Sequence, residues 1–136
     1  MKLAYDTTES LPEILSEISY KDIKKAFPKP TLIHLSGIKS QPVFLSTCLH
    51  GNEDVGFETI KKLHAYLKTH SLPRSLSIFI GNVEAASLGL RRKDQQQDYN
   101  RIWCNNHSPE GRMAQDILQN MKDRQVFASI DLHNNT

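Results

Sequence analysis

The sequence predicts an α/β fold in a single domain that spans residues 1–136. Short runs with the alternating or continuous apolar pattern of strands are interleaved with segments whose apolar residues recur every three or four positions, as on one face of a helix. With 136 residues, of which 38% are hydrophobic, the chain has enough apolar material for one core of ordinary size. No internal repeat, linker or low-complexity segment divides it.

The first predicted element is a helix from about residue 11 to the early 20s. Ser10 and Glu13 match the capping box that begins many helices. The apolar residues that follow recur at helical spacing: Leu11, Ile14, Leu15 and Ile18. Next, residues 31–35 and 42–49 have the pattern of strands, with turn residues 37–41 between them. We expect these two strands to pair as an antiparallel hairpin.

The second of these strands runs into a glycine-containing turn and then into a helix. The turn reads His50, Gly51, Asn52 and Glu53. Beyond it, apolar or aromatic residues return at helical spacing: Phe57, Ile60, Leu63, His64 and Leu67. A strand, a tight turn and a helix in this order present side chains at the rim of a sheet, where α/β proteins place their sites.

Three further elements complete the predicted fold. Residues 77–80 predict a third strand, which Gly81 and Asn82 close. Ser108 and Pro109 stand in the N-cap and first positions of another helix. One face of that helix carries Met113, Ile117 and Met121. Residues 126–132 predict a last, buried strand that leads into His133.

Composition and charge narrow the function classes. The formal net charge is +2, and the longest basic cluster is the short run 91–93, so the concentrated basic face of a nucleic-acid binder is not expected. No run approaches the roughly 20 apolar residues of a membrane span, and the N-terminus lacks the apolar region of a signal peptide. The two cysteines suit free thiols in a reducing compartment. We expect a cytoplasmic protein without nucleic-acid or membrane partners.

Two short segments, each at the end of a predicted strand, carry the residue types of a metal site. They contain His50 with Glu53, and Asp131 with His133. Two imidazoles and one carboxylate suit catalytic zinc, which takes three protein ligands and leaves one position for water. Taken alone, the first segment could be a helix N-cap cluster with Asn52 as the cap, and His133 could be a residue at the rim of the sheet. Together they predict one site at one edge of one sheet.

A third block of motifs lies between these segments. It reads Gly81-Asn82 with Ala85 and Ala86, then Gly89-Leu90-Arg91, then Asp98-Tyr99-Asn100-Arg101-Ile102-Trp103. In the order HGNE, GN, G-x-R, D-x-NR and DLHN, the chain from about residue 42 to 136 resembles the succinylglutamate desuccinylase/aspartoacylase family, within the wider zinc-carboxypeptidase-like group. The resemblance implies a zinc-carboxypeptidase-like mixed sheet flanked by helices, of which these residues would be the N-terminal half.

The resemblance also implies roles for individual residues. His50, Glu53 and His133 would ligate one zinc ion per chain. Asn100 and Arg101 match the pair that holds a substrate carboxylate, which agrees with the two parallel hydrogen bonds that a guanidinium offers such a group. Arg91 matches an arginine that polarises the scissile carbonyl. Because the spacing between residues 82 and 98 is stretched, Arg92 or Lys93 could take that place, or the run could be a solvated loop.

Several neighbours of these residues are expected to be structural. Asp98 would orient the loop of residues 100–101 or a second partner, and Asp131 would hold a ligand or a backbone group. Tyr99 and Trp103 are expected to pack. We interpret Cys48 as a small buried thiol, because His50, Glu53 and His133 already complete the protein ligands of a catalytic zinc.

The leading functional hypothesis is a zinc-dependent hydrolase that cleaves an amide bond of an N-acyl amino acid or a peptide C-terminus. In the resembled family the general base is a glutamate well downstream of the last zinc ligand, so no general base is expected within these 136 residues, which alone would be inactive. One alternative is a non-catalytic metal- or carboxylate-binding module derived from that fold. A weaker alternative is an interaction domain in which both segments are structural. The sequence names neither the acyl group nor the amino acid nor the oligomeric state.

Overall fold

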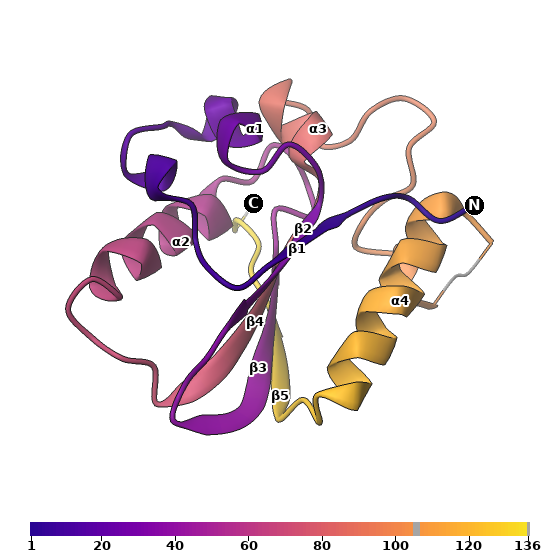
Figure 1. The fold of residues 1–136 in the computed structure, drawn as a ribbon. Coiled ribbons are helices and arrows are strands. Elements are labelled where there is room, and N and C mark those ends of the chain that lie inside the picture. Colours follow the sequence, from indigo (N-terminus) through magenta and orange to yellow (C-terminus); the bar gives the residue numbers. More distant parts are fainter. Residues whose placement is uncertain (105–106, 136) are drawn as a thin grey trace.

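The computed structural model describes residues 1–104 and 107–135, and a five-stranded mixed sheet with helices on both faces forms its centre (Figure 1). The strands are β1 (Asp6–Thr8), β2 (Thr31–Leu35), β3 (Lys39–Thr47), β4 (Arg74–Ile80) and β5 (Ala128–Asp131). The helices are α1 (Ile23–Ala26), α2 (Val55–Tyr66), α3 (Val83–Ser87) and α4 (Pro109–Asp123), with single 3₁₀ turns at Glu13–Ser16, Tyr20–Asp22 and Ile102–Cys104. The predicted α/β class is confirmed.

The strand order places the carboxyl ends of three parallel strands side by side. The order is β1-β2-β4-β3-β5, with β2 antiparallel to β4 and every other neighbouring pair parallel. Since β4, β3 and β5 run in the same direction, the segments that follow β3 and β5 leave the sheet at the same edge. This is the edge at which open α/β sheets place their ligand sites.

Two apolar cores hold the helices against the two faces of the sheet. Figure 1 shows α2 and the N-terminal helical turns on one side and α4 on the other. On the α2 side, Phe57 and Ile60 pack against sheet residues such as Ile78. On the α4 side, Met113 and Ile117 pack against Phe79 and its neighbours. Because β4 is covered on both faces, its second half is buried at every position.

The predicted antiparallel hairpin of residues 31–35 and 42–49 is wrong. β4 lies between β2 and β3 and pairs with both of them. The turn after β2 crosses the start of β4, where Gly37 N–H donates to Ser75 Oγ (3.0 Å) and Ile38 N–H to the Leu72 carbonyl (3.0 Å). The apolar run of β4 lies between the two strands, and its side chains belong to the cores on both faces of the sheet.

The predicted continuous helix from residue 11 to the early 20s is also wrong. Pro12, not Ser10, precedes a single 3₁₀ turn, which is followed by another 3₁₀ turn and the four-residue α1. The Ser16 hydroxyl donates to the Glu13 carbonyl (3.1 Å), a local hydrogen bond of the kind that competes with helix continuation. The helical spacing still identified buried side chains, because Leu11, Leu15 and Ile18 all enter the core on the α2 side.

The last strand was predicted to be buried, but all four residues of β5 are exposed. β5 pairs with β3 alone in the described part of the chain and forms one edge of the sheet. Ile130 is 50% exposed, although its partner Leu45 is buried in the core on the α2 side. The apolar run of residues 126–130 therefore marks a strand, but neither α2 nor α4 extends far enough across the sheet to cover it.

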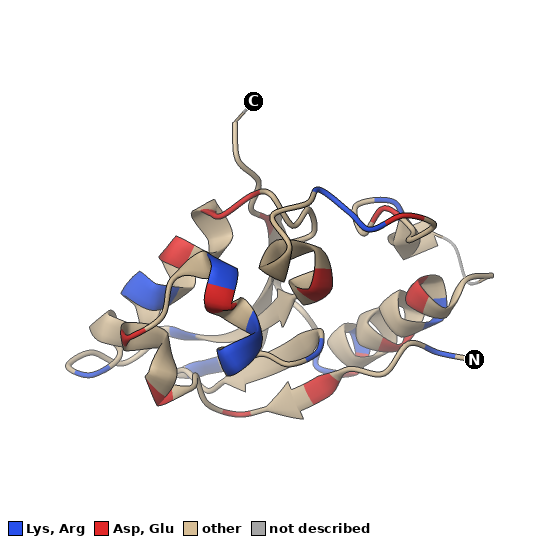
Figure 2. Cartoon of the chain, turned by 90° about the horizontal axis from the view of Figure 1, so that it is seen from above, with Lys and Arg blue, Asp and Glu red and all other residues tan. Residues whose placement is uncertain are grey.

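The charged residues are interspersed in the folded chain as they are in the sequence. Figure 2 looks down on the edge of the sheet where β3 and β5 end, and segments with Lys and Arg alternate there with segments carrying Asp and Glu. Within residues 1–104 and 107–135, no helix combines the length and the apolar character needed to cross a lipid bilayer.

Candidate metal centre

The turn that carries His50 and Glu53 is fixed by its contacts with α3 and the residues after it. The Gly81 and Asn82 N–H groups donate to the Thr47 and Cys48 carbonyls (3.0 and 2.7 Å), and Cys48 then adopts a left-handed conformation (φ 55°) that turns the chain out of the sheet. Gly51 N–H donates to the Arg91 carbonyl (2.9 Å). A side chain at Gly51 would collide with the backbone of residues 85, 86 and 90, so this approach requires glycine.

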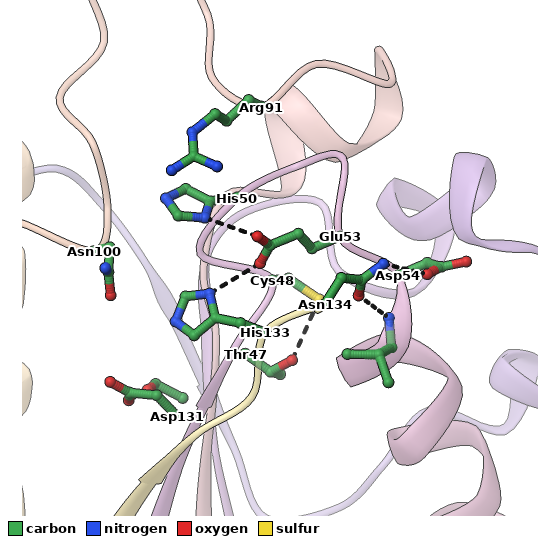
Figure 3. Close-up of polar contacts among 12 residues, drawn as sticks. Thr47, Cys48, His50, Glu53, Asp54, Arg91, Asn100, Asp131, His133 and Asn134 are labelled. Carbon is green, nitrogen blue, oxygen red and sulfur yellow. Dashed lines mark hydrogen bonds and ion pairs between the residues drawn. The ribbon is translucent and has the colours of Figure 1, made fainter. Parts of the chain in front are cut away.

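The side chains of His50, Glu53 and His133 meet at the end of the sheet (Figure 3). Nδ1 of His50 lies 3.1 Å from Glu53 Oε1, and Nδ1 of His133 lies 2.9 Å from Glu53 Oε2. One ligand atom from each residue lies within 4.8 Å of the other two. Zinc binds nitrogen and oxygen ligands at about 2.0–2.2 Å, which places tetrahedral ligand atoms about 3.4 Å apart. The three residues therefore fit a shared metal ion with small side-chain adjustments.

The cluster is largely buried, and its carboxylate stays ionised. His50 and Glu53 are buried, and His133 is partly buried. Burial by itself would raise the pKa of Glu53, but hydrogen bonds from His133 and His50 outweigh it and hold that pKa below its ordinary value. A buried carboxylate that stays ionised between two imidazoles is a ready ligand for a divalent cation.

Asp98 contacts the ring nitrogen of His50 that faces away from Glu53. Its Oδ1 atom lies 3.0 Å from His50 Nε2 and also accepts the Asn100 N–H (2.8 Å). Glu53 lies at Nδ1 of His50 and Asp98 lies at Nε2. The ring can donate a hydrogen bond to both carboxylates only if both of its nitrogens carry a proton. A metal ion held by His50 at Nδ1 would take the place of the proton there, as in the usual arrangement of a carboxylate, a histidine and a metal. Burial opposes ionisation of Asp98, but the Asn100 N–H, His50 and Arg91 keep its pKa below the ordinary value.

The predicted substrate-binding residues lie around this centre at different distances. Arg91 lies beside His50 in Figure 3, with Nη2 4.0 Å from Asp98 Oδ2. Arg92 instead donates to the Gln96 carbonyl (3.1 Å), so of these two arginines Arg91 is the one at the centre. In Figure 3, Asn100 lies to the left of the two histidines, on the side away from Glu53. Arg101 is exposed, and its N–H donates to the Asp98 carbonyl (2.8 Å), which places it in the same turn as Asn100.

A second set of contacts fixes the segment around His133, and the sequence interpretation gave one of these residues, Asn134, no role. Asn134 Oδ1 accepts the Val55 N–H (3.0 Å) at the start of α2, and its Nδ2 donates to Asp54 Oδ1 (3.1 Å). The N-cap residue of α2 is Asp54, whose side chain makes no capping hydrogen bond, and the Asn134 side chain supplies the acceptor that Asn52 was considered for. Its place directly after His133 was the only signal in the sequence. On the strand before them, Asp131 accepts a hydrogen bond from the Ser46 hydroxyl and so ties β5 to β3.

Three other neighbours have the structural positions that the sequence suggested. Cys48 is 2% exposed, and burial raises the pKa of its thiol to about 11, so the thiol stays protonated beneath the cluster. Tyr99 is buried in the core on the α4 side, and Trp103 packs edge-on against Phe44 and Phe79.

Comparison with known proteins gives two similarities. A sequence profile described as the succinylglutamate desuccinylase/aspartoacylase catalytic domain matches residues 39–136. The crystal structure of the succinylglutamate desuccinylase from Chromobacterium violaceum is similar with a TM-score of 0.56 and 22% sequence identity, over 71% of this chain and 34% of that one. At this identity the likeness concerns the fold, and the chain spans about a third of the length of that protein. No curated protein matches the sequence.

Proposed function

The chain belongs to the succinylglutamate desuccinylase/aspartoacylase catalytic-domain family, and we propose that it forms part of a zinc-dependent hydrolase. The bond cleaved is the amide bond of an N-acyl amino acid or of a peptide C-terminus. The observation that carries the proposal is the convergence of the two Nδ1 atoms of His50 and His133 on the single carboxylate of Glu53. A cytoplasmic location is part of the proposal and is supported by the two free cysteines.

The residues at the centre divide into those that hold the ion and those that orient them. His50, Glu53 and His133 are the protein ligands of one Zn²⁺ per chain. A bound zinc ion supplies a Lewis acid and lowers the pKa of water to roughly 7. Asp98 accepts the proton on His50 Nε2, which leaves the Nδ1 lone pair for the ion and fixes the plane of the ring.

The substrate is held by groups on either side of the histidines. Asn100 and Arg101 bind a carboxylate of the substrate, since a guanidinium forms two parallel hydrogen bonds with such a group. Arg91 lies beside His50, half exposed, and polarises the carbonyl of the bond that is cleaved. The backbone supports this arrangement, because both the side chain and the carbonyl of Asp98 accept N–H groups of the turn at residues 100–101.

The general base is proposed to lie outside these 136 residues. In the described part of the chain, the two carboxylates at the centre, Glu53 and Asp98, are both engaged with histidines. A positioned general base contributes on the order of 10²–10⁴ in rate, so residues 1–136 alone are expected to hydrolyse acyl-amino acids very poorly. The missing base also keeps open the second candidate, a module that binds metal or a carboxylate without catalysis.

Zinc content and activity together test the proposal. Metal-replete wild-type protein should contain about one zinc per chain, and His50→Ala and His133→Ala should contain far less. His70→Ala is the matched control, because His70 is exposed and stacks on Tyr66 at the end of α2. Equal zinc in all four proteins contradicts the metal site.

A panel of substrates then separates the two candidate functions. A polypeptide with the complete catalytic domain should hydrolyse an N-succinyl or N-acyl amino acid, or a peptide, with a rate that depends on zinc. Zinc binding without turnover of any substrate favours the binding module. Robust zinc-dependent turnover by residues 1–136 alone would show that the base lies within them.

A further inference from the structure

A polar cavity lies at the end of the sheet opposite the candidate metal centre. Its volume is about 220 Å³, and it is bounded by the face of the sheet under α4, the start of β3 and the C-terminal end of α4. Its polar groups include those of His34, Ser36, Ser40, Ser75, Ser77 and Arg124. From Gln41 to the end of β3 the strand covers about 20 Å at roughly 3.3 Å per residue, so the cavity is separate from His50 and its neighbours.

His34 is the buried polar group of this cavity. The residue is 7% exposed, and its Nδ1 atom lies 2.9 Å from Ser77 Oγ. Its Nε2 atom is fully buried and has no hydrogen-bond partner among the residues that the structure describes. A buried polar atom without a hydrogen-bond partner is destabilising, so a ligand that accepts a hydrogen bond from this nitrogen would be favoured in the cavity. When the Ser77 hydroxyl donates to Nδ1, Nε2 carries the proton and is a donor into the cavity.

The other polar groups are also available as donors. Ser75 Oγ accepts the Gly37 N–H (3.0 Å), which leaves its own O–H free to donate. Arg124 uses Nε to bond Asn120 Oδ1 (2.9 Å), and its two terminal nitrogens have no hydrogen-bond partner in residues 1–104 and 107–135. Burial, with the charge of Arg124 nearby, lowers the pKa of His34 to about 4. At neutral pH the imidazole is therefore an uncharged hydrogen-bonding group.

The charge around the cavity favours an anion. No Asp or Glu lines the cavity within the described part of the chain. An adjoining open hollow shares Ser40, Gln41 and Gln125 with it and adds Lys39 and Arg74. The end of α4 would oppose an anion with its free carbonyls, but the left-handed Gln125 (φ 56°) turns the chain back over them. As a result, Gln125 N–H and Val126 N–H occupy the carbonyls of residues 122 and 121 (3.0 and 3.1 Å).

We propose that this cavity binds a phosphate group, with Arg124 supplying the charge, and with His34 and the hydroxyls of Ser36, Ser40 and Ser75 supplying hydrogen bonds. The cavity is smaller than the roughly 300–1,000 Å³ of sites for drug-sized ligands, which suits a compact anion. A guanidinium binds phosphate through two parallel hydrogen bonds. The remaining donors come from β4, from the start of β3 and from β2, and this spread in three dimensions suits a tetrahedral group.

Residue-resolved NMR titration of the metal-free protein, in the presence of a chelator and at constant ionic strength, tests the proposal. Inorganic phosphate and methyl phosphate are added separately, and the signals of His34 Nε2 and of the Arg124 and Gln125 amides are followed. Saturable shifts at these positions are expected with at least one of the two ions. Saturation with inorganic phosphate alone identifies a free anion as the ligand, and saturation with both ions identifies a phosphate ester as a possible one.

Two variants at the end of α4 show whether the cavity is responsible. Arg124→Gln should weaken phosphate binding about tenfold or more, because it removes charge-assisted hydrogen bonds. Lys122→Gln removes the same charge from the same helix end, outside the residues that line the cavity, and should change the affinity less than twofold. His34→Gln provides a second test where its thermal unfolding stays cooperative, and it should also weaken binding. Shifts that grow linearly with either ion, or equal losses in the two α4 variants, would overturn the proposal.

Discussion

Nε2 of His50 lies 3.0 Å from Oδ1 of Asp98, a residue 48 positions later in the chain. The same carboxylate oxygen accepts the Asn100 N–H, so a single group connects the metal centre with the turn proposed to bind the substrate. We propose that Asp98 is a positioning residue, which orients the His50 ring and, through that ring, the direction of Nδ1. The arrangement gives the first prediction.

Asp98→Asn should weaken zinc binding about 10- to 100-fold, the usual effect of removing the partner of a ligating histidine. The amide side chain keeps the shape but can present its NH₂ group to His50 and no longer stabilises a proton on Nε2. Competition with a chromophoric chelator measures the affinity. Asp94→Asn, an exposed acid in the same loop, is the control and should bind zinc like the wild type. Equal affinities in the two variants would contradict a positioning role for Asp98.

Asn134→Ala should lower the free energy of unfolding by about 1 kcal/mol, the typical cost of losing a helix cap. The variant loses the hydrogen bond to the Val55 N–H and the bond to Asp54 that ties the His133 segment to α2. Urea unfolding gives the stability, and hydrogen exchange of the Val55 amide should become faster. Asn52→Ala serves as the control, since Asn52 is exposed. A larger effect at Asn52 would mean that the cap has been assigned to the wrong asparagine.

Gly51→Ala should be more destabilising than Gly89→Ala. A methyl group at Gly51 meets backbone atoms of residues 85, 86 and 90, which cannot move aside as a flexible side chain can. Overpacking of this kind costs about 3 kcal/mol. Gly89 has a left-handed φ of 68° but open space around it, so only the conformational cost of about 1 kcal/mol is expected there. The comparison requires only urea unfolding of the two variants, and similar losses would show that the turn at Gly51 relaxes.

Local pattern was sufficient to predict most elements of this fold and the metal-ligand candidates. The spacing of Phe57 and Ile60 predicted α2, and the N-cap serine at position 108 predicted the start of α4, where its hydroxyl accepts the Gly111 N–H (2.9 Å). The sequence also placed His50 and His133 at the ends of two strands, and the structure brings them together because β3 and β5 are parallel. Each of these inferences depends on residues that are near in sequence or on a general property of sheets.

The broken helix at residues 11–22 reflects local hydrogen bonding, but the other errors depend on partners that are distant in sequence. Nothing within residues 31–49 shows that β4 separates the two strands, and nothing within residues 126–132 shows that neither α2 nor α4 covers β5. The contacts of Asn134 with α2 and of Asp98 with His50 span 79 and 48 residues. Such contacts are set by the packing of the whole sheet, and a local sequence motif does not predict them.

We expect His34 to lower the free energy of unfolding of the protein at mildly acidic pH. Its pKa in the folded state is about 4, lowered by burial and by Arg124 against the opposing charge of Glu9, whereas the ordinary value is 6.5. Above pH 6.5 the residue is neutral in both states and contributes nothing. Between pH 6.5 and 4 the unfolded chain binds a proton that the folded protein does not, so the free energy of unfolding declines by up to about 3 kcal/mol.

Urea unfolding of the wild type and of His34→Gln at pH 7.5, 5.5 and 4.5 measures this contribution. The stability of the wild type relative to that of the variant should fall as the pH falls, because the glutamine variant does not titrate at this position. His70→Gln, which changes an exposed histidine, should keep the pH dependence of the wild type. A constant difference between wild type and His34→Gln at the three pH values would show that His34 is not held neutral.

Arg101→Lys should impair hydrolysis although the positive charge is kept. The turn of residues 98–101 brings Asn100 beside the histidines, and Arg101 follows it with an exposed side chain. A lysine ammonium is a single point donor and cannot reproduce two parallel hydrogen bonds to a carboxylate. Losing one charge-assisted bond should lower kcat/KM about ten- to a hundredfold, with zinc content unchanged.

The measurement uses a polypeptide with the complete catalytic domain, a carboxylate substrate and its carboxamide analogue. Wild type and the control Arg92→Lys should prefer the carboxylate strongly, and Arg101→Lys should lose most of that preference. If Arg101→Lys discriminates as well as the wild type, another residue binds the carboxylate.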